Sequence, residues 1–174
     1  MNYSKLWEQS SRLQKHSTVV IDSGGKLFTH GARWMHAQLD DMRDTKTTFD
    51  EQTNFEFYGW MKYGVSVGAG LVSAIFLYRL HPLLSPLAVL MFYFCEVQML
   101  FLFPLLIDKV PNPFYASIRE TAAIGALKAM MIIIPVSIRM LLGLFNRKAP
   151  LLNWYTGCLV VVTWYQHEIR NRLK

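Results

Sequence analysis

The sequence predicts an all-α membrane protein in which four transmembrane helices follow an amphipathic helical arm. The chain has 174 residues, of which 52% are hydrophobic, and four long apolar runs begin after residue 58. A helix needs roughly 20 apolar residues to cross about 30 Å of hydrocarbon. The runs, of which the last is marginal in length, occupy about residues 59–80, 83–107, 118–145 and 151–166. The chain therefore divides into an arm at 1–58 and a membrane domain at 59–174.

Positive charge is concentrated in the membrane domain. The arm carries seven Lys/Arg and eight Asp/Glu, whereas the rest of the chain carries eleven Lys/Arg and four Asp/Glu. Basic residues at the ends of apolar runs suit anionic lipid headgroups. A nucleic-acid surface would need clustered Lys/Arg, and the sequence shows no such cluster. We therefore expect lipids at the basic span ends and no nucleic-acid partner.

The Lys/Arg residues that flank the runs also predict a topology. With four spans, most of them fall on the side of the N-terminus, and three fall on the other side: Arg79, Arg147 and Lys148. Positive residues favour the cytoplasmic side, so we expect both termini in the cytoplasm. The first 17 residues contain no apolar core typical of a cleavable signal. The predicted location is the bacterial inner membrane, with an organellar inner membrane as the alternative.

The arm contains a helical pattern at about 26–43. Apolar residues recur there at steps of three and four and so share one face of a helix. This face, which we interpret as a docking face, consists of Leu27, Phe28, Trp34, Met35, Leu39 and Met42. Such a helix packs on a partner protein, lies at a membrane surface, or folds into a small hairpin of its own.

Three carboxylates near the end of this stretch have the spacing DDxxD. They are Asp40, Asp41 and Asp44. Helical carboxylates of this kind hold Mg²⁺, which prefers hard oxygen ligands, in enzymes that bind isoprenoid diphosphates. Such enzymes need a second acidic cluster, and the sequence offers none. A solvated helix end is the favoured interpretation, so we expect no metal and no cofactor.

Small residues recur one turn apart in two of the runs. The first run contains Gly64, Gly68 and Gly70, and the third contains Gly125 and Ala129. Small residues let two helix backbones approach closely, which matters because lipid supplies no hydrophobic drive for helix association. The pattern predicts that the first and third runs pack against each other.

Polar residues inside the runs are few. Glu96 lies within the second run and Lys128 within the third. Consecutive antiparallel spans place both residues about 15 Å from the same end, at 1.5 Å per residue. The sequence therefore predicts an intramembrane ion pair between Glu96 and Lys128. The pair either neutralises its two charges and holds the helices of the bundle together, or forms part of a proton or ion pathway.

No motif in the chain identifies a reaction or a family. We therefore expect a non-catalytic integral membrane subunit of a larger secretion, respiratory or photosynthetic complex. Its partners are other membrane protein subunits, and the arm is the docking element. One alternative is a small homo-oligomeric transporter or channel that uses Glu96 and Lys128. The other is a membrane enzyme that acts on lipid or isoprenoid substrates through the arm carboxylates.

Overall fold

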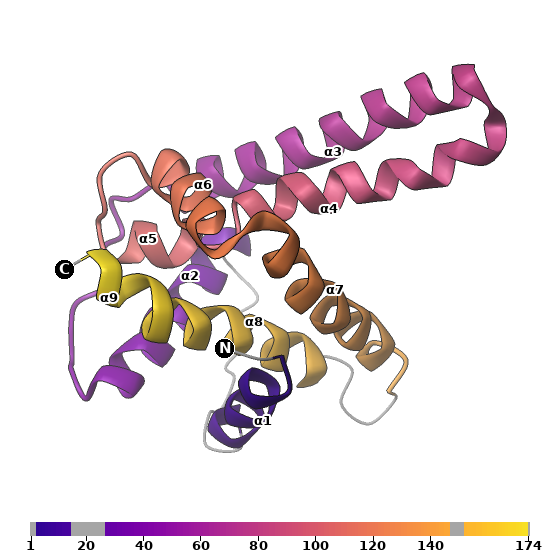
Figure 1. Cartoon of the computed structure of the whole chain (residues 1–174). Helices are drawn as coiled ribbons and strands as arrows, with labels where there is room; N and C mark the ends of the chain where they lie inside the picture. The colour runs from indigo at the N-terminus through magenta and orange to yellow at the C-terminus, as the bar shows by residue number, and fades with distance from the viewer. Residues whose placement is uncertain (1–2, 15–26, 147–151, 174) are drawn as a thin grey trace.

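The structure is a computed structural model that describes residues 3–14, 27–146 and 152–173. Every element in these residues is helical. Figure 1 shows two regions: a long helical hairpin of α3 and α4, and a body of shorter helices gathered at the base of the hairpin. This confirms the all-helical prediction.

The hairpin is built from the first run and most of the second. Helix α3 spans Phe55–Leu80 and begins where the Asn54 side chain accepts a hydrogen bond from the Phe57 backbone N–H at 3.0 Å. A 3-10 turn, η1 (Pro82–Leu87), reverses the chain, and α4 (Ala88–Gln98) returns along α3. Phe92 of α4 packs closely on Gly70 of α3. A Cβ atom added at position 70 would lie 3.3 Å from the Phe92 Cβ, so only a glycine fits there without a shift.

The second and third runs are each broken into two helices. The second turns after α4 and continues as α5 (Leu102–Ile107). The third begins as α6 (Pro113–Ile124) and resumes as α7 (Ala126–Gly143). Gly125 separates them with φ +96°, a conformation that residues with side chains rarely adopt. A single uninterrupted helix over 118–145 is therefore not what forms.

The fourth run forms α8 (Leu152–Trp164), which continues through one π-helical turn, η2 (Tyr165–Ile169), into α9 (Arg170–Leu173). Helix α8 lies at the centre of the body. Helix α1 (Tyr3–Gln14), α2 (Leu27–Arg43) and α7 all pack on it. Its buried residues are Thr156, Gly157, Leu159, Val160, Val162, Thr163 and Trp164.

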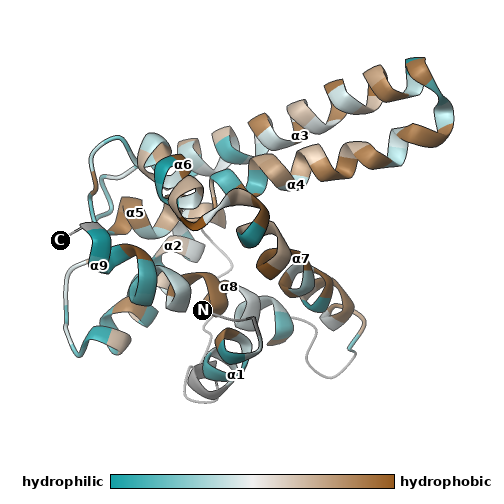
Figure 2. Ribbon diagram, viewed as in Figure 1, coloured by the Kyte–Doolittle hydropathy of each residue, from teal (hydrophilic) through white to brown (hydrophobic). Residues whose placement is uncertain are grey.

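Within the residues that the structure describes, three helical segments are long and apolar enough to cross a membrane: Phe55–Leu80, Pro82–Ile107 and Ala126–Gly143. Figure 2 shows the brown of apolar residues recurring along α3, α4 and α7. Only 6% of the apolar window in α3 is buried inside the protein. The fourth predicted span is not confirmed, because α8 has 13 residues and other helices of the chain cover it.

The predicted docking face of the arm is largely covered by the same chain. Leu39 is fully buried, and Met35 and Met42 pack against the core around it. The Trp34 ring lies 5.3 Å from that of Tyr155 on α8. The arm is thus part of the body in this structure.

The N-terminal end of α2 is fixed on α3. The ring of Phe28 lies over Gly59, and any side chain at position 59 would clash with it. The same ring stacks on that of Tyr63, with 5.6 Å between the ring centroids. Glu56 Oε1 accepts hydrogen bonds from the backbone N–H groups of Phe28 at 2.8 Å and of Thr29 at 3.1 Å. A carboxylate at free N–H groups of a first helical turn acts as a cap. Of the predicted face, Leu27 stays 75% exposed.

Candidate functional site

The most connected polar group in the body is Asp108, which follows α5 at the end of the second candidate span. Arg43 of α2 donates to both carboxylate oxygens, at 2.8 and 2.9 Å. The Tyr165 hydroxyl donates to Oδ2 at 2.8 Å, and Arg170 Nε lies 3.6 Å from the same oxygen. The following residue, Lys109, has φ +54°, so the chain turns sharply here. We call Arg43, Asp108, Tyr165 and Arg170 the Asp108 cluster.

This cluster joins three parts of the chain that are distant in sequence. It connects the end of α2, the end of α5 and the η2–α9 segment. Burial raises the pKa of Tyr165, and the neighbouring charge of Asp108 and the hydrogen bond to it raise that pKa further. The phenol therefore stays protonated and keeps donating to the carboxylate across the physiological pH range.

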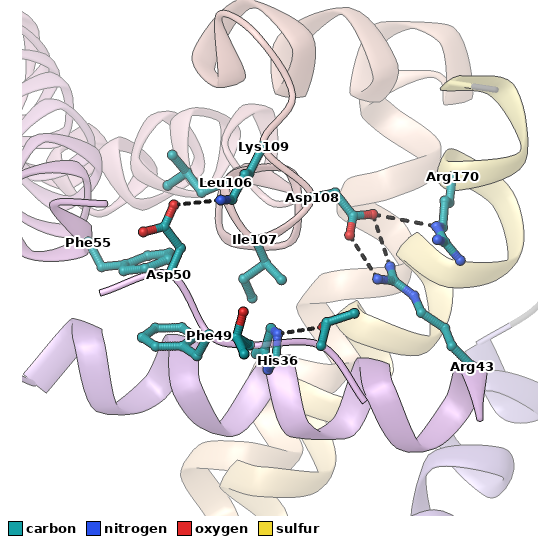
Figure 3. A pocket seen from close by; sticks show the side chains of 12 residues that line it. His36, Arg43, Phe49, Asp50, Phe55, Leu106, Ile107, Asp108, Lys109 and Arg170 are labelled. Carbon is teal, nitrogen blue, oxygen red and sulfur yellow. Dashed lines mark hydrogen bonds and ion pairs between the residues drawn. The ribbon is translucent and has the colours of Figure 1, made fainter. Parts of the chain in front are cut away.

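A hollow of about 380 Å³ opens beside the cluster. Figure 3 shows Asp50 and Lys109 on one side of it, Arg43, Asp108 and Arg170 on the other, and Ile107 between them. Lys109 Nζ lies 2.9 Å from Asp50 Oδ2, and this hydrogen bond is the main reason that the pKa of Asp50 is lowered. The remaining lining residues are His36, Thr47, Thr48, Phe49, Phe55 and Leu106.

The second polar feature lies inside the hairpin. Glu96 of α4 pairs with Lys62 of α3: Lys62 Nζ lies 3.2 Å from Glu96 Oε2, and the side chains are only 10% and 17% exposed. The predicted partner, Lys128, is exposed on α7. The structure therefore shows Lys62–Glu96 in place of the predicted Glu96–Lys128 ion pair: α3 and α7 both pack on α4, but the buried lysine beside Glu96 comes from α3.

Three buried polar atoms find no hydrogen-bond partner among the described residues. They are Trp34 Nε1, Glu96 Oε1 and Gln98 Oε1. Buried polar groups are usually satisfied by protein or ordered water. One carboxylate oxygen of Glu96 is thus committed to Lys62, while the other has no protein donor within the described part of the chain.

The residues predicted for helix packing divide into two groups. Gly64 and Gly68 of α3 have no heavy atom of another element within 4 Å of where a Cβ would stand, so this face is open. Gly70 contacts α4, Gly125 is a helix break, and Ala129 is fully buried in the core. The predicted pairing of the first and third runs is replaced by the packing of α3 and of α7 on α4.

The DDxxD carboxylates do not converge. Asp40 accepts hydrogen bonds from the Thr47 backbone N–H and hydroxyl, both at 2.8 Å. Burial acts to raise the pKa of Asp40, but these hydrogen bonds outweigh it and the pKa is lowered. Asp41 is exposed, and Asp44 sits in a left-handed turn with φ +50°. Within the described residues, no three His, Cys, Asp or Glu side chains gather as a metal site.

These features define the class: in its described part the protein is all-helical, with three helical segments long and apolar enough to span a membrane and a body of shorter helices at the base of the hairpin. Comparison with known proteins finds no family model, no curated sequence and no solved structure that matches the chain.

The Asp108 cluster is not visible in the sequence. Its members are spread from Arg43 to Arg170 with no common spacing. The members of the Lys62–Glu96 pair both lie near or within apolar runs, but no fixed spacing in the sequence links them. Lys62 sits among Trp60 and Tyr63, so the sequence points to an interfacial lysine rather than a buried one.

Proposed function

We propose that this chain is a non-catalytic integral membrane subunit of a larger protein complex, of the secretion, respiratory or photosynthetic kind. In this proposal the hairpin, and not the arm, binds the partner subunit. The arm is an unsuitable docking element because its apolar face packs on α3, α5 and α8. The partner is another transmembrane helix.

The open glycine face of α3 carries this proposal. Gly64 and Gly68 lie one turn apart in a candidate span, and no other element of the described chain approaches either. Glycine in a helix costs up to about 1 kcal/mol relative to alanine. A glycine that faces only lipid gains nothing that offsets this cost, whereas close contact with the backbone of a second helix does offset it.

The two rival functions have less support. A transporter that uses Glu96 needs a carboxylate that can exchange its partner, and Glu96 is already paired with Lys62 inside the hairpin. An enzyme that uses the arm carboxylates needs free oxygen ligands, and Asp40 is occupied in closing the turn after α2.

Mass measurement after gentle solubilisation from native membranes tests the subunit role. One chain has a mass of 20.2 kDa. We expect it to travel in a larger particle with other polypeptides, and Gly68→Leu to release it as a folded chain. Gly31→Leu is the matched control, since Gly31 is equally open but lies in α2 outside the candidate spans.

Three results would contradict the subunit role. The wild-type chain could run alone, Gly68→Leu could leave the particle unchanged, or the particle could contain only copies of this chain. The last result would favour the homo-oligomeric alternative.

We also propose that both termini face the cytoplasm, in a bacterial or organellar inner membrane, which requires an even number of crossings: either the two spans of the hairpin alone, or all three candidate spans together with α8. The Gln9 side chain lies 3.3 Å from the His167 ring, so segments near the two ends of the chain share one side. Cysteines introduced at Ser4 and Asn171, both exposed, report this directly. Labelling of only one of them by an impermeant reagent in intact cells would show that the termini lie on opposite sides.

A further inference from the structure

The hollow beside the Asp108 cluster lies where two candidate spans end. Phe55, the first residue of α3, lines it, and so do Leu106 and Ile107 at the end of the second span. The exposed rings of Phe57 and Trp60 follow in the first turns of α3. Exposed aromatic side chains at a span end mark the membrane–water interface. A ligand in the hollow therefore meets both hydrocarbon and water.

The charges around the hollow favour an anion. Three cationic side chains and two carboxylates line it, which leaves one formal positive charge with His36 neutral. Arg43 is committed to Asp108 and, through Nε, to Gln166 at 2.9 Å. Both carboxylates already accept from cations, so the hollow suits an anion better than a metal ion or an amine.

Arg170 is the cation of the hollow whose N–H donors are least used by the protein. Its Nε lies 3.6 Å from Asp108 Oδ2, and its side chain is 31% exposed. The Arg170 guanidinium donates no hydrogen bond to the residues that the structure describes, whereas the Arg170 backbone N–H bonds the Tyr165 carbonyl. A guanidinium has five N–H donors whose planar arrangement matches two oxygens of a phosphate.

Lys109 supplies a second, exchangeable cation. Its side chain is 68% exposed and, among the residues that the structure describes, pairs with Asp50 alone. Exposed pairs of this kind contribute little stability, so the ammonium can turn to another anion at small cost. A second hollow of about 520 Å³ adjoins the first and shares Asp50, Leu106 and Lys109 with it. The two hollows together offer room for a headgroup larger than phosphate alone.

We propose that this hollow binds the phosphodiester headgroup of an anionic phospholipid. Arg170 and Lys109 approach the headgroup from opposite sides of the hollow, and the glycerol and first methylenes lie on the half-buried Phe49 and Ile107. A singly charged diester matches the single positive charge of the lining. The site follows from the position of the spans and does not depend on the subunit role.

Native mass spectrometry of the full-length chain tests this proposal. The protein is loaded into nanodiscs of phosphatidylcholine with a minor share of phosphatidylglycerol, and the retained lipids are counted after release into detergent. We expect wild type to retain phosphatidylglycerol preferentially. Arg170→Gln should lower that retention about fivefold, the effect of one interfacial cation. Arg172→Gln, an exposed residue of the same helix that does not line the hollow, should not.

Two further variants separate binding from folding. Arg170→Lys keeps the charge and should keep most of the retention. Lys109→Gln breaks only an exposed pair, so the chain should stay folded and lose retention in the same direction as Arg170→Gln.

Any of three results would overturn the lipid site. Wild type could retain both lipids equally, or Arg170→Gln and Arg172→Gln could lower retention equally. Alternatively, soluble glycerol 1-phosphate could displace phosphatidylglycerol, which would assign the hollow to a water-soluble phosphate instead.

Discussion

The hairpin and the body use helices of similar apolar character in opposite ways. In α3 only 6% of the apolar window is buried, and residues such as Val72 and Phe76 stay more than 60% exposed. In α8, by contrast, Leu159, Val160 and Val162 are fully buried among α1, α2 and α7. Apolar composition predicts that a helix avoids water. Whether protein or lipid covers the helix instead depends on the neighbouring helices.

Polar groups differ in the same way. The hairpin has one ion pair, Lys62–Glu96, between its two helices. The body concentrates its charged contacts at Asp108, where three segments meet and where Arg43 and Tyr165 donate. The hairpin is therefore expected to depend on a single pair, whereas the body depends on a network and on close packing.

The largest expected effect comes from removing one partner of the hairpin pair. Lys62→Met or Glu96→Gln alone should destabilise the chain by about 3–5 kcal/mol, because each leaves a buried group without its partner. The double substitution should recover part of that loss. Denaturation by SDS in mixed micelles measures all three variants.

Lys128→Met is the control for this cycle, since Lys128 is exposed and should matter little. Additive losses at positions 62 and 96 would show that the two residues do not interact. A loss at Lys128 as large as that at Lys62 would restore the pairing that the sequence predicts.

Two glycines sharpen the contrast between the regions. Met140 of α7 lies over Gly157 of α8, so Gly157→Leu should overfill the body and cost about 2–3 kcal/mol. Gly68→Leu adds the same side chain to an open face of α3 and should leave the isolated chain folded. Thermal unfolding in detergent compares the two variants. Equal melting temperatures would contradict the difference between an open hairpin face and a packed body.

Asp108→Asn should weaken the body by about 2 kcal/mol, since it removes the charge that accepts from Arg43 and Tyr165. Asp41→Asn, at an exposed carboxylate of α2, should change stability by no more than about 0.5 kcal/mol. Proteolysis rates of the folded chain measure both. A wild-type rate for Asp108→Asn would mean that the cluster does not hold the three segments together.

The smallest effect is expected at the Asp50–Lys109 pair, which links the arm to the end of the second span. The pKa of Asp50 is lowered in the folded chain, mainly by the hydrogen bond from Lys109. Its contribution is therefore present above the unfolded pKa of about 4 and lost as the pH falls through the folded value. Proteolysis of the loop around Asp50 should rise on acidification. In Lys109→Gln that rise should be smaller, because the folded pKa of Asp50 then lies closer to the unfolded value, and an unchanged profile would exclude the pair as its cause.

The sequence by itself determined which segments are helical and how apolar they are. The run at 59–80 became α3 with its end at Leu80, because His81-Pro82 cannot continue a helix. The three-and-four spacing predicts that Leu39 and Met42 share a helix face, and in the structure Leu39 is buried while Met42 packs, half-buried, against the same core. These results follow from local periodicity and backbone restrictions, which act over a few residues and are readable without a partner.

Only the tertiary structure decided what covers each face. It placed α8 inside the body, turned the docking face of α2 onto its own chain, gave Glu96 the partner Lys62, and built the Asp108 cluster. Hydropathy assigns each residue the same preference whether protein or lipid surrounds it, so it cannot rank these outcomes. Gly125 shows the same limit: its composition suits a packing face, and its φ of +96° makes it a break instead. Contacts between distant segments depend on how whole helices pack, and that arrangement has no local signature.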